Sequence, residues 1–275
     1  MTRAALSPDR ATSPMLAARS LIFNALFYLN LVVLMIVGLP TMLFGRKAVF
    51  ALARLWGSIS VWLLDKICGL KLEYRGVENI PPGAVLIAAK HQSFLETFAL
   101  LKYAPDFAII LKRQLTYVPL FGLYLIVSRQ IAIDRARGRQ ALQQIAGAAR
   151  PVFAAGRQVF IYPEGTRRLP GAPPKYKQGV AALYTETGVS CLPVAVNTGL
   201  FWRRRGFLRR PGLAVIEYLP VIKPGLERAE FAKRLQFTIE SACARLNAEA
   251  VRQDPSLAAV VAEGAKSDEE TLRPA

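Results

Sequence analysis

The first pattern along the chain is a long apolar stretch near the N-terminus. Residues 20–45 contain no charged side chain, and the run Leu21–Leu39 approaches the roughly 20 apolar residues that a helix needs to cross a bilayer. Pro40 interrupts the helical pattern, and a second, mostly apolar helix is predicted over Ala48–Leu64. We therefore predict membrane-associated helices over residues 20–66, which either span the bilayer or form a hairpin in one leaflet.

The segment before these helices, residues 1–19, is basic and contains prolines, so we expect a flexible arm. A cleaved signal peptide is the alternative. It is disfavoured because the apolar run exceeds the roughly 7–15 residues of a signal sequence and no small-residue cleavage site follows it. Basic residues flank the helices on both sides, so the charge distribution does not orient them.

After Gly69 the pattern changes to short apolar runs that alternate with helical stretches, which is typical of an α/β fold. Apolar residues recur at helical spacing over Arg139–Ala149 and Arg228–Glu249. Between and before these helices, seven strands are predicted: Leu70–Tyr74, Ala84–Ala89, Phe107–Leu111, Gln130–Ile133, Gln158–Tyr162, Leu192–Val196 and Leu213–Tyr218.

These elements predict an α/β fold with a central mixed sheet flanked by helices, preceded by an N-terminal hydrophobic helical membrane segment. The catalytic domain would occupy residues 67–250. From Asp254 to the C-terminus there are five acids and two bases, a net charge of −3. We expect residues 251–275 to form a disordered tail.

Composition points to a lipid partner. The chain has 36 Lys and Arg against 19 Asp and Glu, a net charge of +17, yet 53% of its residues are hydrophobic and its mean hydropathy is +0.28. The charge favours a phosphate-bearing partner, and the hydropathy disfavours a soluble nucleic-acid binder. Three widely spaced cysteines and a single histidine predict neither a disulfide framework nor a metal site.

The single histidine, His91, follows the predicted strand that ends at Ala89. Ser93 and Glu96 match the S-x-x-E pattern of a capping box, which would begin a helix at Ser93 and leave His91 in the preceding loop. Glu96 could then accept a hydrogen bond from the imidazole, while the other ring nitrogen takes a proton from an attacking hydroxyl. The alternative is that Glu96 only caps the helix and His91 is an ordinary surface group.

Ser93 is disfavoured as a nucleophile. As a helix cap its oxygen would accept hydrogen bonds from backbone N–H groups, and no nucleophile elbow precedes it. Cys191 lies in a predicted strand and is expected to be a core residue.

A second motif, Pro163-Glu164-Gly165-Thr166-Arg167-Arg168, follows the strand predicted to end at Tyr162. The motif predicts a tight turn that presents one carboxylate and two guanidinium groups at a sheet edge. Because a planar guanidinium can donate two parallel hydrogen bonds to a phosphate, the turn suits a phosphate monoester.

Together these motifs resemble the glycerolipid acyltransferase family, specifically its 1-acylglycerol-3-phosphate acyltransferases, whose hallmark is a histidine, four residues and an acid. Two positions depart from the family pattern: Glu96 replaces the usual Asp, and Gln114 stands where Glu is common. Four blocks between Leu70 and Leu226 carry the resemblance: Lys90–Glu96, Lys112–Arg135, Tyr162–Arg168 and Leu192–Asn197.

The resemblance implies transfer of a fatty acyl group from acyl-CoA or an acyl carrier protein thioester to the sn-2 hydroxyl of lysophosphatidic acid, which gives phosphatidic acid. It implies no permanently bound cofactor and no metal. His91 would be the general base, and Glu96 would hold the imidazole. The residues implied to bind the glycerol phosphate are Arg135, Glu164, Gly165, Thr166 and Arg167, with Lys112 as a further candidate.

A basic segment with aromatic residues follows the last block. Its arginines and aromatic side chains favour contact with an anionic membrane surface. A nucleic-acid patch, a solvated loop and a contact with CoA phosphates are the alternatives. The residues assigned to the membrane interface are Trp202, Arg203, Arg204, Arg205, Phe207, Arg209 and Arg210.

The expected partners are lysophosphatidic acid, the thioester donor and anionic membrane lipids, with no nucleic acid. The expected location is a membrane, with the catalytic domain facing the cytoplasm. Three alternatives remain: an acyltransferase for another lysolipid such as a lyso-ornithine lipid, a non-catalytic protein that binds anionic lipid, and a membrane-tethered nucleic-acid binder. The acyl-chain length is not readable from the sequence.

Overall fold

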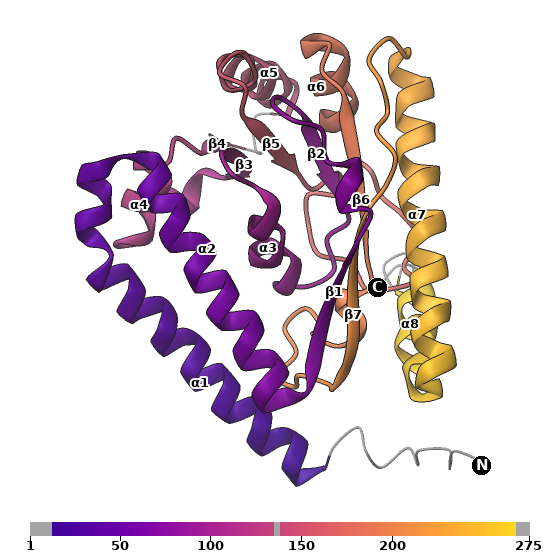
Figure 1. The fold of residues 1–275 in the computed structure, drawn as a ribbon. Helices are drawn as coiled ribbons and strands as arrows, with labels where there is room; N and C mark the ends of the chain where they lie inside the picture. The colour runs from indigo at the N-terminus through magenta and orange to yellow at the C-terminus, as the bar shows by residue number, and fades with distance from the viewer. Residues whose placement is uncertain (1–12, 135–137, 268–275) are drawn as a thin grey trace, which may run out of the picture.

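The computed structural model describes residues 13–134 and 138–267, which form one seven-stranded mixed sheet with helices on both faces (Figure 1). All seven predicted strands are present, with ends shifted by at most two residues. In chain order the strands are β1 Leu70–Arg75, β2 Leu86–Ala89, β3 Phe107–Lys112, β4 Ile131–Ile133, β5 Gln158–Ile161, β6 Cys191–Val196 and β7 Gly212–Tyr218. The helices are α1 Pro14–Val37, α2 Arg46–Leu63, α3 Leu95–Ala99, α4 Phe121–Val127, α5 Gly138–Ala154, α6 Gly179–Thr187, α7 Arg228–Gln253 and α8 Ala258–Lys266.

The strand order is β1-β7-β6-β2-β5-β3-β4. Neighbouring strands from β6 to β4 run parallel, β6 and β7 are antiparallel, and β7 pairs in parallel with β1. The register places Ala88 of β2 opposite Ile161 of β5 on one side and Pro193 of β6 on the other. The carboxyl ends of β2, β3, β4, β5 and β6 therefore lie along one edge, where ligands bind in open α/β sheets.

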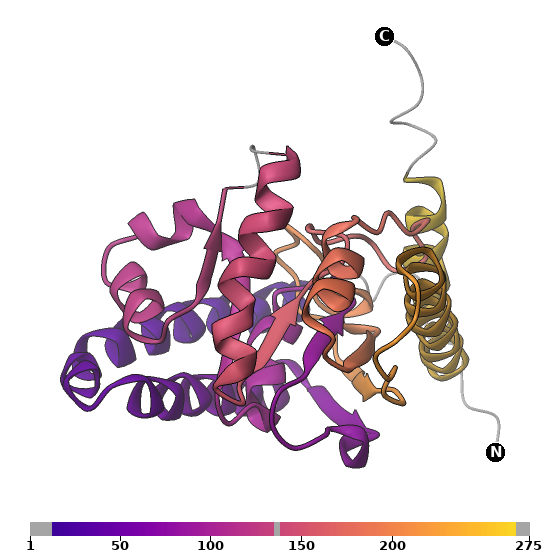
Figure 2. The same cartoon turned by 90° about the horizontal axis from the view of Figure 1, so that it is seen from above.

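Alternate residues of each central strand enter two separate cores. In β2, Ile87 and Ala89 pack with residues of α1, α2 and α3, whereas Leu86 and Ala88 pack with residues of α5, α6 and α7. Figure 2 shows the α1–α2 pair and α7 on opposite sides of the molecule. Because both faces are covered, the strands are continuous apolar runs rather than alternating ones.

The helical hairpin of α1 and α2 packs against the domain along one side only. Phe23, Phe27 and Phe50 are at most 1% exposed, and the Phe27 ring contacts Trp202 with the centroids 5.6 Å apart. Other apolar side chains face outward, and Leu43 and Phe44 at the hairpin tip are 87% and 79% exposed. Both helices are long and apolar enough to cross a membrane. Since burying a large apolar side chain contributes about 1.5–3 kcal/mol, so many exposed ones indicate an apolar partner such as a membrane.

Two predicted disordered segments are helical where the structure describes them. Residues 14–19 of the expected arm form the start of α1, where Ser13 caps the helix by accepting a hydrogen bond from the Leu16 N–H. The expected disorder from residue 251 is wrong up to residue 267, because α7 continues to Gln253 and α8 follows. We expected disorder because the tail has a net negative charge. However, Leu257 and Val260 of this segment are buried, and their packing holds it against the domain. Residues 1–12 and 268–275 lie outside the described part.

Candidate active site

The site is built where the parallel strands end. β2 leads into His91, β5 leads into the turn with Glu164 and Arg167, and β6 leads into a short 3-10 helix, Thr198–Leu200. These segments meet through backbone hydrogen bonds, since the Arg168 N–H donates to the carbonyl oxygen of His91 at 2.9 Å. The sheet topology thus brings residues from distant parts of the sequence to one edge.

His91 and Glu96 form a hydrogen-bonded pair. Nδ1 of His91 lies 2.8 Å from Oε1 of Glu96, and the imidazole side chain is 16% exposed while Glu96 is fully buried. A buried carboxylate facing Nδ1 favours the tautomer with a proton on Nδ1, which leaves Nε2 with a free electron pair. The ring also stacks on Tyr162, with the centroids 4.1 Å apart. Burial, followed by the nearby Glu96 charge, raises the pKa of Tyr162, so this neighbour stays neutral.

Ser93 and Glu96 form part of the predicted capping box, but the helix begins at Leu95 rather than at Ser93. Oγ of Ser93 accepts a hydrogen bond from the Leu95 N–H at 3.1 Å, and Oε1 of Glu96 accepts from the Ser93 N–H at 2.7 Å. α3 begins at Leu95, so His91 precedes the helix and can face Glu96. Glu96 therefore caps the helix and binds the imidazole at the same time, which unites the two interpretations of this residue.

The other oxygen of Glu96 is held by a residue that the sequence analysis missed. The hydroxyl of Thr198 donates to Oε2 at 2.6 Å, and Thr198 is completely buried. The backbone of this segment approaches the His91 loop so closely that a Cβ on Gly199 would lie 2.8 Å from Cβ of Gln92. The position of Thr198, immediately after the fourth motif block at a strand end, was the available signal.

The turn after β5 has the compact geometry predicted for it. The Gly165 N–H donates to the Tyr162 carbonyl at 2.8 Å, and Gly165 has a φ of 67°, a conformation that glycine adopts without strain. Thr166 is exposed and Arg167 is half-buried, and both line a cavity of about 500 Å³. The turn thus presents a hydroxyl and a guanidinium to a cavity beside the His91 loop.

Glu164 does not fit its predicted role as a phosphate ligand. It is 3% exposed, and its Oε1 accepts a hydrogen bond from Nζ of Lys90 at 3.1 Å. Lys90 also donates to Glu240 of α7 at 2.7 Å. Burial lowers the pKa of Lys90, but the charges of Glu164 and Glu240 outweigh it and raise that pKa overall. Glu164 therefore anchors the turn to β2 and α7 instead of facing a ligand.

This buried ion pair predicts a stability effect. Replacing Lys90 with Met removes the cation 3.1 Å from the buried Glu164 and leaves that carboxylate with the longer ion pair to Arg168 at 3.6 Å, so the free energy of unfolding should fall by about 3 kcal/mol. Urea unfolding of the detergent-solubilised protein, followed by circular dichroism, measures the change. Lys233→Met, at an exposed position of α7, is the control and should change stability by at most about 0.5 kcal/mol. Equal midpoints for the two variants would contradict the anchoring role.

The structure says less about two other predicted phosphate ligands, Lys112 and Arg135. Lys112 ends β3 at the same edge of the sheet, two strands from β2, and its side chain is exposed. Arg135 lies outside the described residues, two positions after the end of β4. The structure thus brings the backbone of the turn that carries Thr166 and Arg167 next to the His91 loop, and leaves Lys112 at the periphery.

The predicted membrane-interface segment is partly internal. Trp202 and Arg209 are each 5% exposed, and the Arg209 guanidinium lies 4.0 Å above the Trp202 ring. Arg209 also donates to Oδ1 of Asn24 in α1 at 2.7 Å, so these two residues are wrong as membrane contacts. Arg204, Arg205 and Phe207 are exposed, whereas the partly exposed Arg203 pairs with Glu263 of α8. Arg210 is partly exposed as well.

Comparisons with known proteins place this geometry in context. A family model described as Acyltransferase matches residues 71–197. The 1-acyl-sn-glycerol-3-phosphate acyltransferase of Pseudomonas aeruginosa is 40% identical over 157 residues, which are 57% of this chain and 61% of that protein. The protein of the same name from Borreliella burgdorferi is 30% identical over 187 residues, 67% of this chain and 72% of that protein.

A solved structure supports the fold. The crystal structure of the 1-acyl-sn-glycerophosphate acyltransferase PlsC from Thermotoga maritima superposes with a TM-score of 0.69 at 21% identity, and the match covers 83% of this chain and 96% of that one. The chain spans 54–61% of the length of several curated relatives that it matches.

Proposed function

Since the chain belongs to the acyltransferase family that contains the 1-acyl-sn-glycerol-3-phosphate acyltransferases, we propose that it acylates the sn-2 hydroxyl of lysophosphatidic acid to give phosphatidic acid. The donor in this proposal is a fatty acyl thioester, carried by CoA or by acyl carrier protein. The observation that carries the proposal is the His91–Glu96 pair, with Nδ1 and Oε1 2.8 Å apart at the edge of the sheet that also presents Arg167.

The proposed chemistry follows from the free electron pair on Nε2 of His91. This nitrogen takes the proton of the sn-2 hydroxyl as the oxygen attacks the thioester carbonyl. The buried Glu96 carboxylate stabilises the imidazolium that forms. When the tetrahedral intermediate collapses, the carbon–sulfur bond breaks, and the imidazolium returns its proton to the leaving thiolate. Ser93 takes no part, because it is completely buried and its oxygen caps α3.

The test is a panel of donors and acceptors. We expect the purified protein to form phosphatidic acid from lysophosphatidic acid, with release of free thiol, from acyl-CoA or from acyl carrier protein thioester. Lyso-ornithine lipid and a lysophospholipid with a large head group are the competing acceptors. Thiol release no faster than that of His91→Ala would refute the proposal, and a clear preference for another lysolipid would change its acceptor.

Arg167 is the proposed ligand of the lysophosphatidate phosphate. Loss of a hydrogen bond to a charged group costs about 1.5–3 kcal/mol, so Arg167→Gln should raise KM for lysophosphatidic acid by about 10- to 100-fold. Steady-state kinetics at saturating donor measure this change. Arg234→Gln, at an exposed position of α7, is the matched control and should leave KM unchanged. An unchanged KM in Arg167→Gln would show that the phosphate binds elsewhere.

We further propose that α1 and α2 hold the enzyme on a membrane with its catalytic domain on the cytoplasmic side. Support comes from the outward-facing apolar side chains of the hairpin, including Leu43 and Phe44. The net charge of +17 adds attraction to anionic lipids. This attraction opposes the desolvation cost of basic groups at the membrane surface. The Phe207 carbonyl accepts a hydrogen bond from Asn24 of α1, which places the exposed Phe207 side chain beside that helix. Phe207 would therefore add an apolar contact with the membrane.

A further inference from the structure

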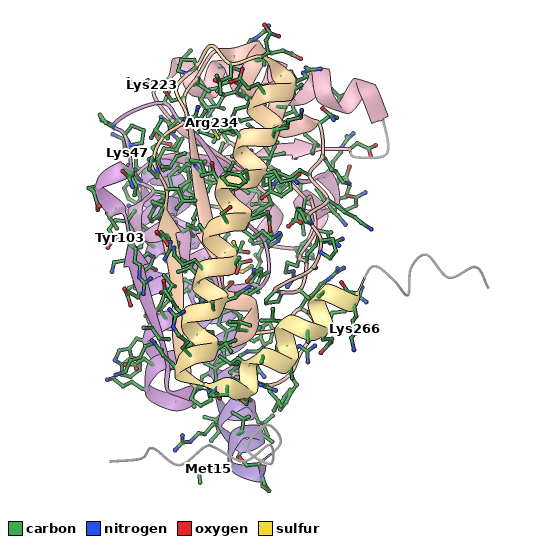
Figure 3. The ribbon with its side chains drawn as sticks, turned by 90° about the vertical axis from the view of Figure 1, so that its right-hand side faces the viewer. Met15, Lys47, Tyr103, Lys223, Arg234 and Lys266 are labelled. Atoms are coloured by element: carbon green, nitrogen blue, oxygen red, sulfur yellow. The ribbon has the colours of Figure 1, made fainter. Side chains whose placement is uncertain are left out.

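A strongly basic cavity extends from Arg167, the proposed ligand of the lysolipid phosphate. The cavity, of about 500 Å³, lies between the turn after β5, the loop at residues 203–206, and Glu263 and Ser267 at the end of α8. Figure 3 shows α8 angled away from the end of α7, with Lys266 marking its last residue. The volume is within the roughly 300–1,000 Å³ that small-molecule sites occupy. Five arginines contribute to its lining: Arg167, Arg168, Arg203, Arg204 and Arg205.

The positive charges around this cavity are poorly balanced. Among the described residues that line it, Glu263 is the one carboxylate and pairs with Arg203, while Arg168 lies 3.6 Å from Glu164, which is outside the lining. Burial, and then the charges of Arg205 and Arg167, lower the pKa of Arg204. Arg204 donates a hydrogen bond to the Arg167 carbonyl oxygen at 2.9 Å, which brings the guanidinium to the turn without neutralising it. A bound anion would therefore relieve repulsion between these guanidinium groups.

The loop that carries these arginines is held in position. Arg205 has a φ of 59°, which is unusual for a residue with a side chain and is maintained only where surrounding contacts fix the backbone. Next to it, Arg209 donates a hydrogen bond to the carbonyl oxygen of Gly206 at 2.8 Å, and Arg209 is buried and stacks on the buried Trp202. The N–H of Arg209 also donates to Oγ of Ser20 in α1 at 2.9 Å. A fixed loop lowers the entropy cost of binding a ligand.

We propose that this cavity binds the phosphorylated nucleotide end of CoA, with Arg204 and Arg205 as its main ligands. This inference rests on the proposed function, because it assigns the donor of that reaction. A phosphate monoester carries about −1.5 to −2 charges, and CoA adds a pyrophosphate, which matches a multiply charged cavity better than a single lysolipid phosphate does. Guanidinium groups also stack on the adenine ring.

The position of the cavity suits a donor. Thr166, Arg167 and Arg168 form one wall, and the Arg168 N–H donates to the His91 carbonyl. The nucleotide would therefore lie next to the catalytic loop, from which the flexible arm of CoA carries the thioester to His91.

Binding of 3′,5′-adenosine diphosphate, which has a ribose phosphate and no acyl group, tests the proposal without catalysis. We expect titration calorimetry on the full chain in detergent to detect binding to wild type. The double variant Arg204→Gln/Arg205→Gln should bind at least about 10-fold more weakly, since it loses charge-assisted hydrogen bonds. Glu263→Gln removes the acid and should bind as tightly as wild type or more tightly. Arg234→Gln should bind like wild type. No binding to wild type, or equal binding by the double variant, would overturn the proposal.

Steady-state kinetics separate the nucleotide site from the lysolipid site. The double variant should raise KM for acyl-CoA by about 10-fold or more and leave KM for lysophosphatidic acid unchanged. A rise in KM for lysophosphatidic acid alone would assign the cavity to the lipid head group, and a defect only with acyl carrier protein thioester would assign it to that protein. Either result overturns the proposal. Nucleotide binding without any acyl transfer to lysophosphatidic acid would instead refute the proposed function.

Discussion

Replacement of His91 by alanine is expected to lower kcat for acyl transfer by about 10²–10⁴-fold, the usual contribution of a general base. Without the imidazole, the sn-2 hydroxyl must lose its proton to water while it attacks, and the thiolate must leave without a nearby proton donor. The residues proposed to bind the lipid phosphate and the donor do not include His91, so both KM values should change little. The rates of thiol release and phosphatidic acid formation, measured together, give the loss in kcat.

Two controls separate chemistry from folding. His91→Gln keeps a polar side chain of comparable length over the Tyr162 ring, and it should be as inactive as the alanine variant. Both variants should unfold near the wild-type temperature, because the imidazole is partly exposed and its hydrogen bonds lie at the edge of the core. Retention of more than about a tenth of wild-type kcat by either variant would exclude His91 as the base.

The sheet could be predicted because its strands are short apolar runs bounded by polar turns. In β2 and β6 nearly every side chain is buried, so hydrophobicity alone marks them. The α8 segment could not be predicted in the same way. The tail from Asp254 to the C-terminus, which contains α8, has five acids and two bases. Yet α8 packs so closely on the loop at Pro170 that a Cβ on Gly264 would lie 1.9 Å from the Pro170 carbonyl oxygen. That contact depends on tertiary structure and has no local signature.

In the candidate site too, some contacts could be predicted from the sequence and others could not. The pairing of His91 with Glu96 follows from a five-residue spacing and a local capping pattern, so the sequence was sufficient. Lys90 and Glu164 are 74 residues apart, and Glu96 and Thr198 are 102 apart. Nothing in the residue types distinguishes Glu164 as an anchor from a ligand until the strand order brings β2 and β5 together.

The basic loop shows why charge patterns mislead when burial is unknown. Arginines and aromatic residues alternate there as they do at a membrane surface, but Arg209 and Trp202 stack inside the protein. Only the arginines between them, Arg203 to Arg205, reach the cavity. The sequence therefore locates a basic segment, and the packing of α1 and α8 decides which of its charges are accessible.

Glu96→Gln is expected to lower kcat by about 10²–10³-fold while the fold of the site is preserved. The amide oxygen can still accept hydrogen bonds from the Gln92 and Ser93 N–H groups, which lie 2.8 and 2.7 Å from Oε1 in the wild type. His91 thus keeps a hydrogen-bond partner but loses the negative charge that stabilises the imidazolium. Single-turnover kinetics across a pH series measure the loss directly, because product release does not limit that rate.

Variants of Glu96 and of its partner Thr198 show whether the Glu96 carboxylate acts by its charge or only by its shape. Glu96→Asp keeps the charge but, being one methylene shorter, cannot reach both Nδ1 of His91 and the hydroxyl of Thr198, so it should retain more activity than Glu96→Gln. Thr198→Val leaves Oε2 buried without its donor, at a cost of about 1–3 kcal/mol, and should lower kcat by about 10-fold, whereas Thr198→Ser restores the hydroxyl and most of the rate. If Glu96→Gln and Glu96→Asp lost activity equally, the charge would not matter, and Glu96 would be only a helix cap.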